Sequence, residues 1–144
     1  MGVQIRLSRE EDIDHLIEIW LEGSVQAHHF IDQEYWKSMK DEMKHKYLPM
    51  SVTYVVEQGE RVVGFVSMVE DYLAALFIDP NFQKNGFGKS LLDYVKRKHD
   101  TVELKVYRKN AIALHFYVKN GFVIKETVRD EQTSEEEFVL SWQK

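Results

Sequence analysis

The spacing of hydrophobic and polar residues in the first third of the chain predicts one strand followed by two helices. Apolar and charged residues alternate over residues 5–7, and Ser8 with Glu11 forms the capping-box pattern that begins a helix. Apolar residues then recur at helical spacing as far as Gly23, where this helix is predicted to end. A second amphipathic helix is predicted over residues 32–48, ended by the proline at position 49.

From residue 51 onward the spacing is mainly that of β-strands. Strands are predicted over residues 51–58, 61–69, 72–79, 101–107, 122–128 and 136–142, and helices over residues 86–99 and 110–120. The whole order is βααβββαβαββ, a mixed α/β pattern. It predicts a single domain over residues 1–144, with a central, mostly antiparallel, twisted sheet and helices on both of its faces. The sequence has no internal repeat or low-complexity linker that would mark a second domain.

Composition supports a globular domain and excludes some partners. The chain has 144 residues, of which 44% are hydrophobic and 12% aromatic, enough to form a core. Its 19 basic and 24 acidic residues give a formal net charge of −5 without a basic tract, so we expect no nucleic-acid partner. It has no cysteine, no apolar run long enough to span a bilayer and no leader-like segment at residues 1–6. We therefore expect a cytoplasmic protein with no membrane association.

Residues 81–92 contain two glycines and a Gly-Lys-Ser triplet, which raises the question of a nucleotide-binding loop. A P-loop requires a further glycine at the position that Gln83 occupies here. A dinucleotide-binding loop requires a third glycine where this chain has Leu91. Both nucleotide motifs are therefore incomplete.

The two glycines still favour an anion site, because they precede the first turn of a predicted helix. Backbone N–H groups in that turn lack intrahelical partners and lie at the positive end of the helix dipole. Gly86 and Gly88 leave room for a ligand, and Lys84 and Lys89 add positive charge. The alternative is a loop whose glycines serve only to turn the chain.

Two segments of the chain resemble the GCN5-related N-acetyltransferases (GNAT). In residues 76–92 an apolar strand and a proline lead into a Gln-Lys-Asn-Gly-Phe-Gly sequence, similar to the acyl-CoA-binding segment of that family. Residues 110–122 are similar to its downstream motif of asparagine, alanine, an aromatic pair and Gly-Phe. The order of the two motifs, and the element order over nearly the whole chain, also agree with the family. The resemblance implies acetyl-CoA as cosubstrate and a splayed pair of central strands.

The resemblance also implies which residues bind acetyl-CoA. The backbone of the strand before the loop would pair with the pantetheine arm, and the loop would bind the pyrophosphate. The downstream helix would add contacts, although its first asparagine could simply cap that helix. The implied cofactor-binding residues are Leu76, Phe77, Ile78, Gln83, Lys84, Asn85, Gly86, Phe87, Gly88, Lys89, Ser90, Asn110, Ala113 and Phe116.

Acyl transfer to an amine needs a neutral amine, a polarised carbonyl and a proton for the departing thiolate. The resemblance places Tyr117 near the thioester sulfur, where its hydroxyl would protonate or hydrogen-bond the thiolate; the alternative is a tyrosine that packs beside Phe116. For the base, many relatives have a glutamate on the strand before the loop, which this chain lacks. Glu70, just before that strand, could act through water or be a solvated strand end. His28 could contact the acceptor, accept a proton or be structural.

These residues predict an acetyl-CoA-dependent N-acetyltransferase that acts on a primary amine of a small molecule or a protein. Direct transfer is expected because no cysteine is available to form an acyl-enzyme. The alternative is a catalytically weak acyl-CoA-binding regulatory module of the same fold, in view of the missing strand glutamate. We expect no metal site, because the histidines lack ligand spacing, and a monomer or a homodimer.

Overall fold

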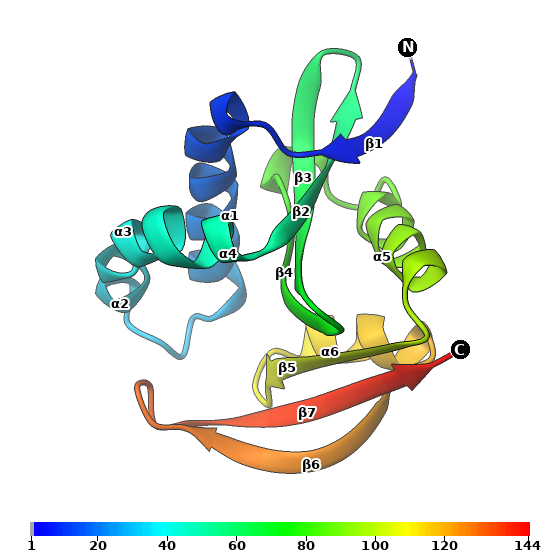
Figure 1. Ribbon diagram of the computed structural model, residues 1–144. Helices are drawn as coiled ribbons and strands as arrows, with labels where there is room; N and C mark the ends of the chain where they lie inside the picture. The colour runs from blue at the N-terminus through cyan, green and yellow to red at the C-terminus, as the bar shows by residue number, and fades with distance from the viewer. Residues whose placement is uncertain (1) are drawn as a thin grey trace.

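The chain folds around one mixed sheet of seven strands in the order β1-β2-β3-β4-β5-β7-β6 (Figure 1). The computed structural model describes residues 2–144. The strands are β1 (Val3–Leu7), β2 (Val52–Gln58), β3 (Arg61–Val69), β4 (Tyr72–Ile78), β5 (Thr101–Tyr107), β6 (Val123–Asp130) and β7 (Glu135–Gln143). Adjacent strands are antiparallel except β4 and β5, which are parallel. The predicted order of strands along the chain and the mostly antiparallel sheet are therefore confirmed.

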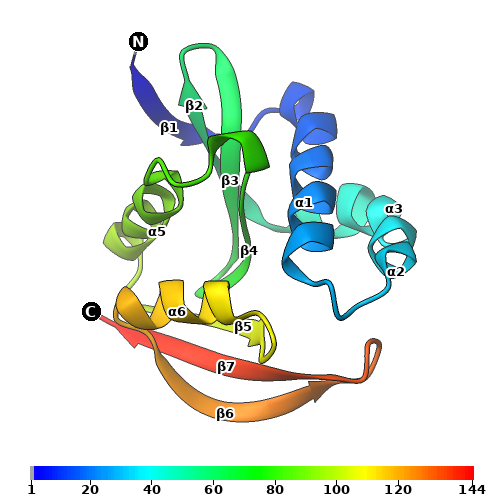
Figure 2. The same ribbon diagram turned by 180° about the vertical axis from the view of Figure 1, so that it is seen from behind.

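Helices lie on both faces of this sheet, as predicted. They are α1 (Ile13–Ala27), α2 (Gln33–Ser38), α3 (Lys40–Glu42), α4 (Leu48–Met50), α5 (Phe87–Lys98) and α6 (Ala111–Lys119). Short 3₁₀ turns (Glu10–Asp12 and Pro80–Phe82) come before α1 and α5, and a π-helical turn (Met43–Tyr47) joins α3 to α4. Figures 1 and 2 show α1 and α5 on opposite sides of β2, β3 and β4. Within residues 2–144, no helix is long and apolar enough to cross a membrane.

The alternation of side chains along the central strands builds a separate apolar layer on each face. Neighbouring residues such as Val55 and Val56, or Phe65 and Val66, are fully buried in different layers. One layer joins α5 and α6 to the sheet, and the other joins α1 and α2 to it. Strand β4 contributes to both layers, so its position is fixed from both sides.

Strands β4 and β5 lie side by side only at one end. Tyr72 and Glu103 are the one pair of facing residues found between them in the described chain. The N–H of Glu103 donates to the carbonyl of Asp71 over 2.9 Å. Beyond this point the strands diverge, and Figure 1 shows β5 turned away from β4. The predicted splay is present, and it leaves one edge of β4 without a strand partner.

Strand β4 also has a bulge beside the splay. Ala75 faces Ser67 of β3 and Leu73 faces Met68, so Ala74 between them has no facing residue. In consequence Leu73 packs in the layer with α5, whereas Ala75 packs in the layer with α1. The bulge therefore redirects the strand where its other edge is free.

Helix α1 runs past its predicted end at Gly23 and stops at Ala27. Gly23 is buried within the helix, and a Cβ at this position would lie 2.6 Å from Cδ1 of Phe77 on β4. The absence of a side chain thus allows α1 to approach the sheet closely. The prediction that Gly23 ends the helix was wrong, because this glycine serves packing and not a change of chain direction.

The predicted helix over residues 32–48 is instead a series of short helical segments. The segments α2, α3 and α4 follow one another, and Pro49 lies inside α4 instead of preventing it. Proline is tolerated in a first helical turn because its missing N–H would have no partner there. The predicted apolar face is confirmed, since Trp36, Met43 and Leu48 are buried in the layer with α1.

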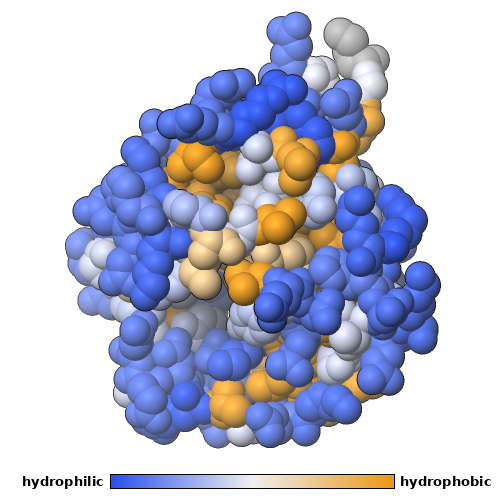
Figure 3. Space-filling view, viewed as in Figure 1, coloured by the Kyte–Doolittle hydropathy of each residue, from blue (hydrophilic) through white to orange (hydrophobic). Residues whose placement is uncertain are grey.

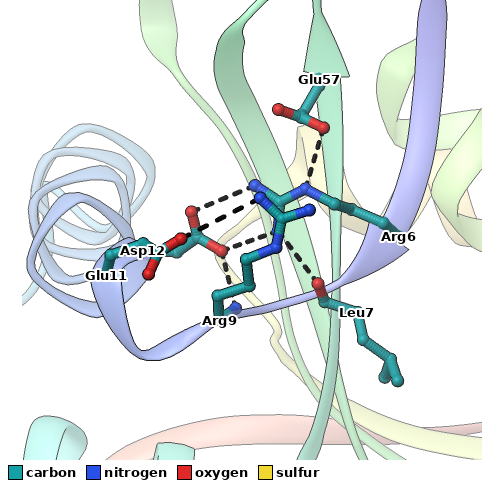
Figure 4. A network of polar contacts seen from close by, with 6 residues as sticks. All are labelled: Arg6, Leu7, Arg9, Glu11, Asp12 and Glu57. Atoms are coloured by element: carbon teal, nitrogen blue, oxygen red, sulfur yellow. Dashed lines mark hydrogen bonds and ion pairs between the residues drawn. The ribbon is translucent and has the colours of Figure 1, made fainter.

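A network of charged residues joins β1 to the start of α1 (Figure 4). Arg6 donates to both carboxylate oxygens of Asp12, at 2.8 and 3.2 Å, and its Nε donates to Glu57 of β2 at 2.8 Å. The hydrogen bonds from Arg6 hold the pKa of the Asp12 carboxyl below its usual value. The network therefore ties the first helix to the edge of the sheet.

The cap of this first helical segment is shifted by one residue from the predicted one. The N–H of Arg9 donates to the carboxylate of Asp12 over 2.7 Å, in place of the predicted pair of Ser8 and Glu11. Ser8 does not cap, because its N–H donates to the carbonyl of Thr53 and extends the pairing of β1 with β2. The predicted capping box was therefore wrong in its residues.

Candidate active site

The far half of β4 offers free backbone groups to a ligand. Leu76, Phe77 and Ile78 face residues of β3 on one side, whereas the splay leaves their other side without a strand. The side chains of Leu76 and Ile78 pack against the layer with α5, and that of Phe77 packs against the layer with α1. Since alternate backbone groups of a strand point to its two edges, this half of β4 can pair with an extended ligand while its side chains serve the core.

The loop after β4 is fixed by its own polar contacts. Asp79 is buried, accepts the N–H of Asn81 over 3.0 Å and lies 3.3 Å from a guanidinium nitrogen of Arg61. The side chain of Asn85 donates to the carbonyls of Phe82, at 3.0 Å, and of Gln83, at 3.3 Å. The loop that carries Gln83 and Asn85 is thus held in shape before any ligand binds.

This loop delivers open backbone to the start of α5. Gly86 has φ +80°, a left-handed conformation that favours glycine, and a Cβ there would meet no atom within 4 Å. The N–H of Ser90 donates to the carbonyl of Gly86 over 3.0 Å and makes the first bond of the helix. The N–H groups of Phe87, Gly88 and Lys89 precede that bond and have no partner within the helix. The predicted anion site is therefore geometrically available.

The remaining residues of the loop either anchor it or surround it. Phe87 is buried, and Ser90 Oγ donates to the Gly86 carbonyl over 3.0 Å. Lys84 is exposed with φ +67°, and Lys89 is ion-paired with Asp93 at 2.8 Å. The positive charge expected here is therefore present, although one of the two lysines already has a counter-ion.

Helix α6 reaches the same place from a distant part of the chain. A Cβ at Gly88 would lie 3.6 Å from Cζ of Phe116 on α6 and 3.9 Å from Cγ1 of Ile78 on β4. Ala113 and Phe116 pack against the layer with α5. The two sequence motifs, together with the end of β4, therefore meet at one point of the fold.

Tyr117 is a buried residue of α6. Its ring makes edge-to-face contacts with Phe116, at a centroid distance of 5.1 Å, and with Phe122, at 5.4 Å. Burial raises the pKa of the Tyr117 hydroxyl. The hydroxyl has no hydrogen bond to another residue of the described chain. It is thus protonated at neutral pH and free to donate, while its ring fulfils the packing role that was the alternative.

Asn110 caps α6, and the same side chain contacts His28. Its Oδ1 accepts the N–H of Ala113 over 3.2 Å, and its Nδ2 lies 3.3 Å from Nε2 of His28. This orientation makes Nε2 of His28 an acceptor and places the hydrogen of the neutral ring on Nδ1. Asn110 therefore caps α6, as the sequence allowed, and it makes a second contact that the sequence did not predict.

His28 is buried in a cluster of aromatic rings. It stacks on Trp36 and contacts Tyr107 edge to face, each at a centroid distance of 5.0 Å, and Phe30 lies at 5.7 Å. Burial lowers the pKa of His28 to about 4, so the ring is neutral at pH 7. Its Nδ1 and the indole nitrogen of Trp36 are buried without a hydrogen-bond partner among the described residues.

Glu70 lies apart from these residues. It is exposed in the turn between β3 and β4, with φ +55°, next to Asp71 at the closed end of the splay. The glycine loop follows the opposite end of β4, which at about 3.3 Å per residue is roughly 20 Å away. The structure therefore does not bring Glu70 to the glycine loop.

Several residues that sequence reasoning missed gather on the other side of the splay. Tyr72 faces Glu103, Tyr107 faces Glu137, and the Tyr107 hydroxyl donates to Asp130 over 2.6 Å. Burial, together with the charges of Glu137 and Glu103, raises the pKa of Tyr72 to about 12. We call these five residues the acceptor-side group. For Glu103, Tyr107 and Glu137, the signal in the sequence is the alternation of polar and apolar residues over 101–107 and 137–142.

The space between α1–α4 and the strands β5 and β7 is open to solvent on one face of the molecule. Figure 3, viewed as Figure 1, has a hollow to the left of and below its centre, where Figure 1 has α1–α4 above the strands β5 and β7. The hydroxyl of Tyr35 on α2 donates to Gln132 in the β6–β7 turn over 2.8 Å, which links the two sides at the edge. No group of three or more metal-ligating side chains was found in residues 2–144.

Comparison with known proteins gives a consistent assignment. Residues 49–124 match the model of the acetyltransferase (GNAT) domain. The chain is 33% identical over 139 residues to the peptidyl-lysine N-acetyltransferase YiaC of Escherichia coli (strain K12), and the match covers 96% of this chain and 95% of YiaC. More than half of the chain is therefore matched by a family model, and nearly all of it by a relative.

Solved structures of the same family have the same fold. The solution structure of apo-form YjaB from Escherichia coli matches with a TM-score of 0.86 and 27% identity, over 99% of this chain and 98% of YjaB. The crystal structure of the PaiA N-acetyltransferase from Thermoplasma acidophilum, in complex with coenzyme A, matches with a TM-score of 0.84 and 25% identity over 100% of both chains. The chain thus belongs to the GNAT family and is an N-acetyltransferase whose acetyl donor is acetyl-CoA.

Proposed function

We propose that this N-acetyltransferase acetylates the ε-amino group of lysine in proteins. The observation that carries the proposal is the likeness to YiaC, a peptidyl-lysine N-acetyltransferase, along nearly the whole of both chains. The acceptor-side group agrees with it, because carboxylates and aromatic rings suit an ammonium group at the end of an aliphatic stem.

In this proposal acetyl-CoA lies in the opening between β4 and β5. The pantetheine arm pairs with the free edge of β4 at Leu76, Phe77 and Ile78, as an added strand would. The pyrophosphate accepts from the unpaired N–H groups at the start of α5, where Gly86 offers no side chain to exclude it. This placement of acetyl-CoA is supported by a chemical match. The ligand has groups that bind backbone, and the site offers many backbone groups without partners.

Tyr117 is proposed to act at the thioester sulfur. A phenol with a pKa of ~10 protonates a thiolate whose thiol has a pKa of ~8.5 only uphill, by roughly 2 kcal/mol, and burial adds to this cost. The hydroxyl therefore acts first by donating a hydrogen bond to the sulfur. It passes on its proton only as the C–S bond breaks.

His28 and Asn110 are proposed to shape the acceptor side. At a pKa of about 4, His28 is a weak proton acceptor at pH 7, so we assign it a contact with the acceptor and not the role of base. Asn110 fixes the histidine ring and the start of α6 with one side chain. Glu70 remains a candidate only through a chain of water molecules, because it lies at the closed end of the splay.

The proposal is tested by measuring release of CoA thiol with three acceptors: lysine-containing peptides, the same peptides with lysine replaced by arginine, and spermidine. We expect thiol release with the lysine peptides only, together with a 42 Da mass gain on lysine, which is the mass of an added acetyl group. Turnover with spermidine alone would replace protein lysine by a polyamine as the acceptor.

The rival is an acyl-CoA-binding module with little turnover. It predicts tight binding of acetyl-CoA with no thiol release from any of the three acceptors. Calorimetric titration with acetyl-CoA, carried out on the same preparation, separates this rival from an inactive or misfolded sample.

A further inference from the structure

Strand β7 begins with three consecutive glutamates, of which only two have a counter-ion. Glu135 lies 3.1 Å from Nζ of Lys109, and Glu136 lies 2.8 Å from a guanidinium nitrogen of Arg108. Glu137 is half-buried and has neither an ion pair nor a hydrogen bond with another side chain of the described chain. A carboxylate that is withdrawn from water without a partner is unfavourable, so its retention in this place requires another explanation.

The register of the sheet places Glu137 on the side of the acceptor. Phe138 and Trp142 pack in the layer with α5 and α6, so Glu137, which alternates with them, points to the opposite face. It faces Tyr107 of β5, whose ring is buried in the layer with α1 and α2. The carboxylate of Glu137 thus belongs to the face of β5–β7 that is turned towards α1 and α2.

Three tyrosines on other elements of the fold agree with this placement of Glu137. Burial raises the pKa values of Tyr72 on β4, Tyr107 on β5 and Tyr35 on α2, and the negative charge of Glu137 raises each of them further. These effects agree with the register, which places Glu137 on the face of β5–β7 that is turned towards the space between the sheet and α1–α2. The thioester of acetyl-CoA bound along β4 would be next to this space.

Three other charged groups lie around Glu137, and in the described chain none of them forms an ion pair with it. Asp130 on β6 is occupied by the Tyr107 hydroxyl, and Lys105 on β5 is exposed and forms no ion pair with Glu137. Glu103 on β5 faces Tyr72 at the closed end. Burial, followed by the charge of Asp130, raises the pKa of the Glu137 carboxyl, while Lys105 lowers it, and the net change is upward. Glu137 is consequently a better proton acceptor than an ordinary glutamate.

Two uncharged groups beside Tyr107 also lack partners. Nδ1 of His28 and Nε1 of Trp36 are buried without hydrogen bonds, and the two rings lie 5.0 and 6.3 Å from the ring of Tyr107. Unpaired buried polar atoms are rare in folded proteins. Their presence next to the unpaired carboxylate marks this region as one that a polar ligand completes.

We propose that Glu137 is the general base of this acetyltransferase: it binds the ammonium group of the acceptor and takes one of its protons. The inference rests on the proposed function, because it requires an amine acceptor. Strand β4 lacks the glutamate that could act as the base. Glu137 supplies this base from β7, on the opposite side of the site.

The step balances as follows in atoms and charge. The Glu137 carboxylate takes a proton from the ammonium, the freed nitrogen lone pair forms the C–N bond, and the C–S bond breaks. The CoA thiolate takes the proton of the Tyr117 hydroxyl. The second proton that the nitrogen loses on becoming an amide restores Tyr117 through water, and the proton on Glu137 passes to solvent.

The test compares Glu137→Gln with Glu136→Gln, a matched control that removes the exposed neighbouring charge. With a lysine peptide at pH 7 we expect kcat/KM to fall about 100-fold in Glu137→Gln, the lower end of the range for general base catalysis, and to change little in Glu136→Gln. Glu137→Asp should recover part of the activity. Affinity for acetyl-CoA should be the same in all variants, which shows that they fold.

The pH profile separates a base from a merely structural residue. In the unaltered protein kcat/KM is expected to be level up to the pKa of lysine, ~10.4. In Glu137→Gln it should rise about tenfold per pH unit towards that value, because solvent must then remove the proton. If Glu137→Gln and Glu136→Gln have equal activity at every pH, the inference is overturned.

If no lysine peptide is acetylated, the proposed function is refuted. A binding measurement then still tests the role of Glu137. The unfolding temperature of the CoA complex is measured with and without α-N-acetyl-lysine amide at pH 7. Stabilisation of the unaltered protein that is lost in Glu137→Gln but kept in Glu136→Gln supports an ammonium site at Glu137. Equal behaviour of both variants removes it.

Discussion

The proposed donor side and the proposed acceptor side of this protein are built in different ways. The donor side consists of two continuous segments, 76–90 and 110–117, and it offers mainly backbone groups and glycines. The acceptor side combines single side chains from the end of α1, from α2 and from strands β4, β5 and β7. The proposed site for the constant cosubstrate thus consists of local sequence motifs. The proposed site for the variable acceptor depends instead on how distant strands are paired.

The two sides also differ in how their polar atoms are satisfied. On the donor side the loop is closed by its own hydrogen bonds, such as those of Asp79 and Asn85, before acetyl-CoA binds. On the acceptor side Glu137, His28 and Trp36 retain polar atoms without partners. We infer that the donor side is preorganised and that the acceptor side is completed only by its substrate.

The largest expected effect comes from the point where the two sides meet. Tyr117→Phe keeps the ring and its contacts with Phe116 and Phe122 but removes the hydroxyl. We expect kcat to fall roughly ten- to a thousandfold, with little change in stability or in acetyl-CoA affinity. Steady-state kinetics with Tyr94→Phe, a partly buried tyrosine of α5, provides the matched control. A loss confined to KM for acetyl-CoA would make the hydroxyl a ground-state binding group.

The next effect is the pH dependence of the free energy of unfolding, which reports the burial of His28. The pKa of His28 is about 4 in the folded protein and 6.5 without burial, so the unfolded chain binds more protons between these values. The free energy of unfolding is therefore highest above pH 6.5 and falls as the pH is lowered towards 4, by about 3 kcal/mol for a shift of this size. Urea unfolding at a series of pH values measures it.

His28→Phe isolates this contribution, because it keeps an aromatic ring against Trp36 and Tyr107. The difference in unfolding free energy between the two proteins should depend on pH only within this window. Parallel pH curves for the two proteins would contradict the burial of a neutral histidine.

A smaller effect is expected on the donor side. Gly86→Glu puts a side chain and a negative charge where the pyrophosphate would bind, and we expect acetyl-CoA affinity to fall at least tenfold, or about 1.4 kcal/mol. Gly59→Glu is a matched control, since Gly59 also has a positive φ (+65°) and free space around it but lies in the β2–β3 turn. Calorimetric titration compares the two. Equal affinities in both folded variants would exclude the loop from the binding site.

The smallest expected effect tests the contact between α1 and β4. Gly23→Ala places a Cβ 2.6 Å from the Phe77 ring, so the ring, α1 or β4 has to shift. The strain of overpacking, typically 1–3 kcal/mol, is partly offset by the better helix propensity of alanine, so we expect a net loss of about 1 kcal/mol. Urea unfolding measures it. An unchanged midpoint would mean that α1 is free to move away from β4.

The fold could be predicted from the sequence because the spacing of apolar residues reports the period of each element. The order of strands and helices and the splay of β4 from β5 were found in this way or from the family resemblance, and both are confirmed. The errors at Gly23 and Ser8 have one cause. Each of these two residues was judged by its local preference, whereas a tertiary contact or a sheet bond decides its role. The error at Pro49 has another cause, because this proline stands in a first helical turn, where it is tolerated.

The candidate site could be predicted only in part for a related reason. The residues of the glycine loop and α6 form recognisable motifs, and Tyr117 was found through one of them. Glu137 is the third of three consecutive glutamates, and nothing in the local sequence separates it from the two ion-paired ones. Only the pairing of β7 with β5 shows which of the three faces the opening.

The central claim is that the donor side binds acetyl-CoA through backbone groups and presents its sulfur to Tyr117, across the splay from the acceptor-side group. A crystal structure of the complex with acetyl-CoA tests it most directly. We predict the pantetheine arm along Leu76–Ile78, the pyrophosphate on the N–H groups of residues 87–89 and the sulfur within hydrogen-bonding distance of the Tyr117 hydroxyl. A pyrophosphate bound away from the start of α5, or a sulfur out of reach of Tyr117, would contradict the account.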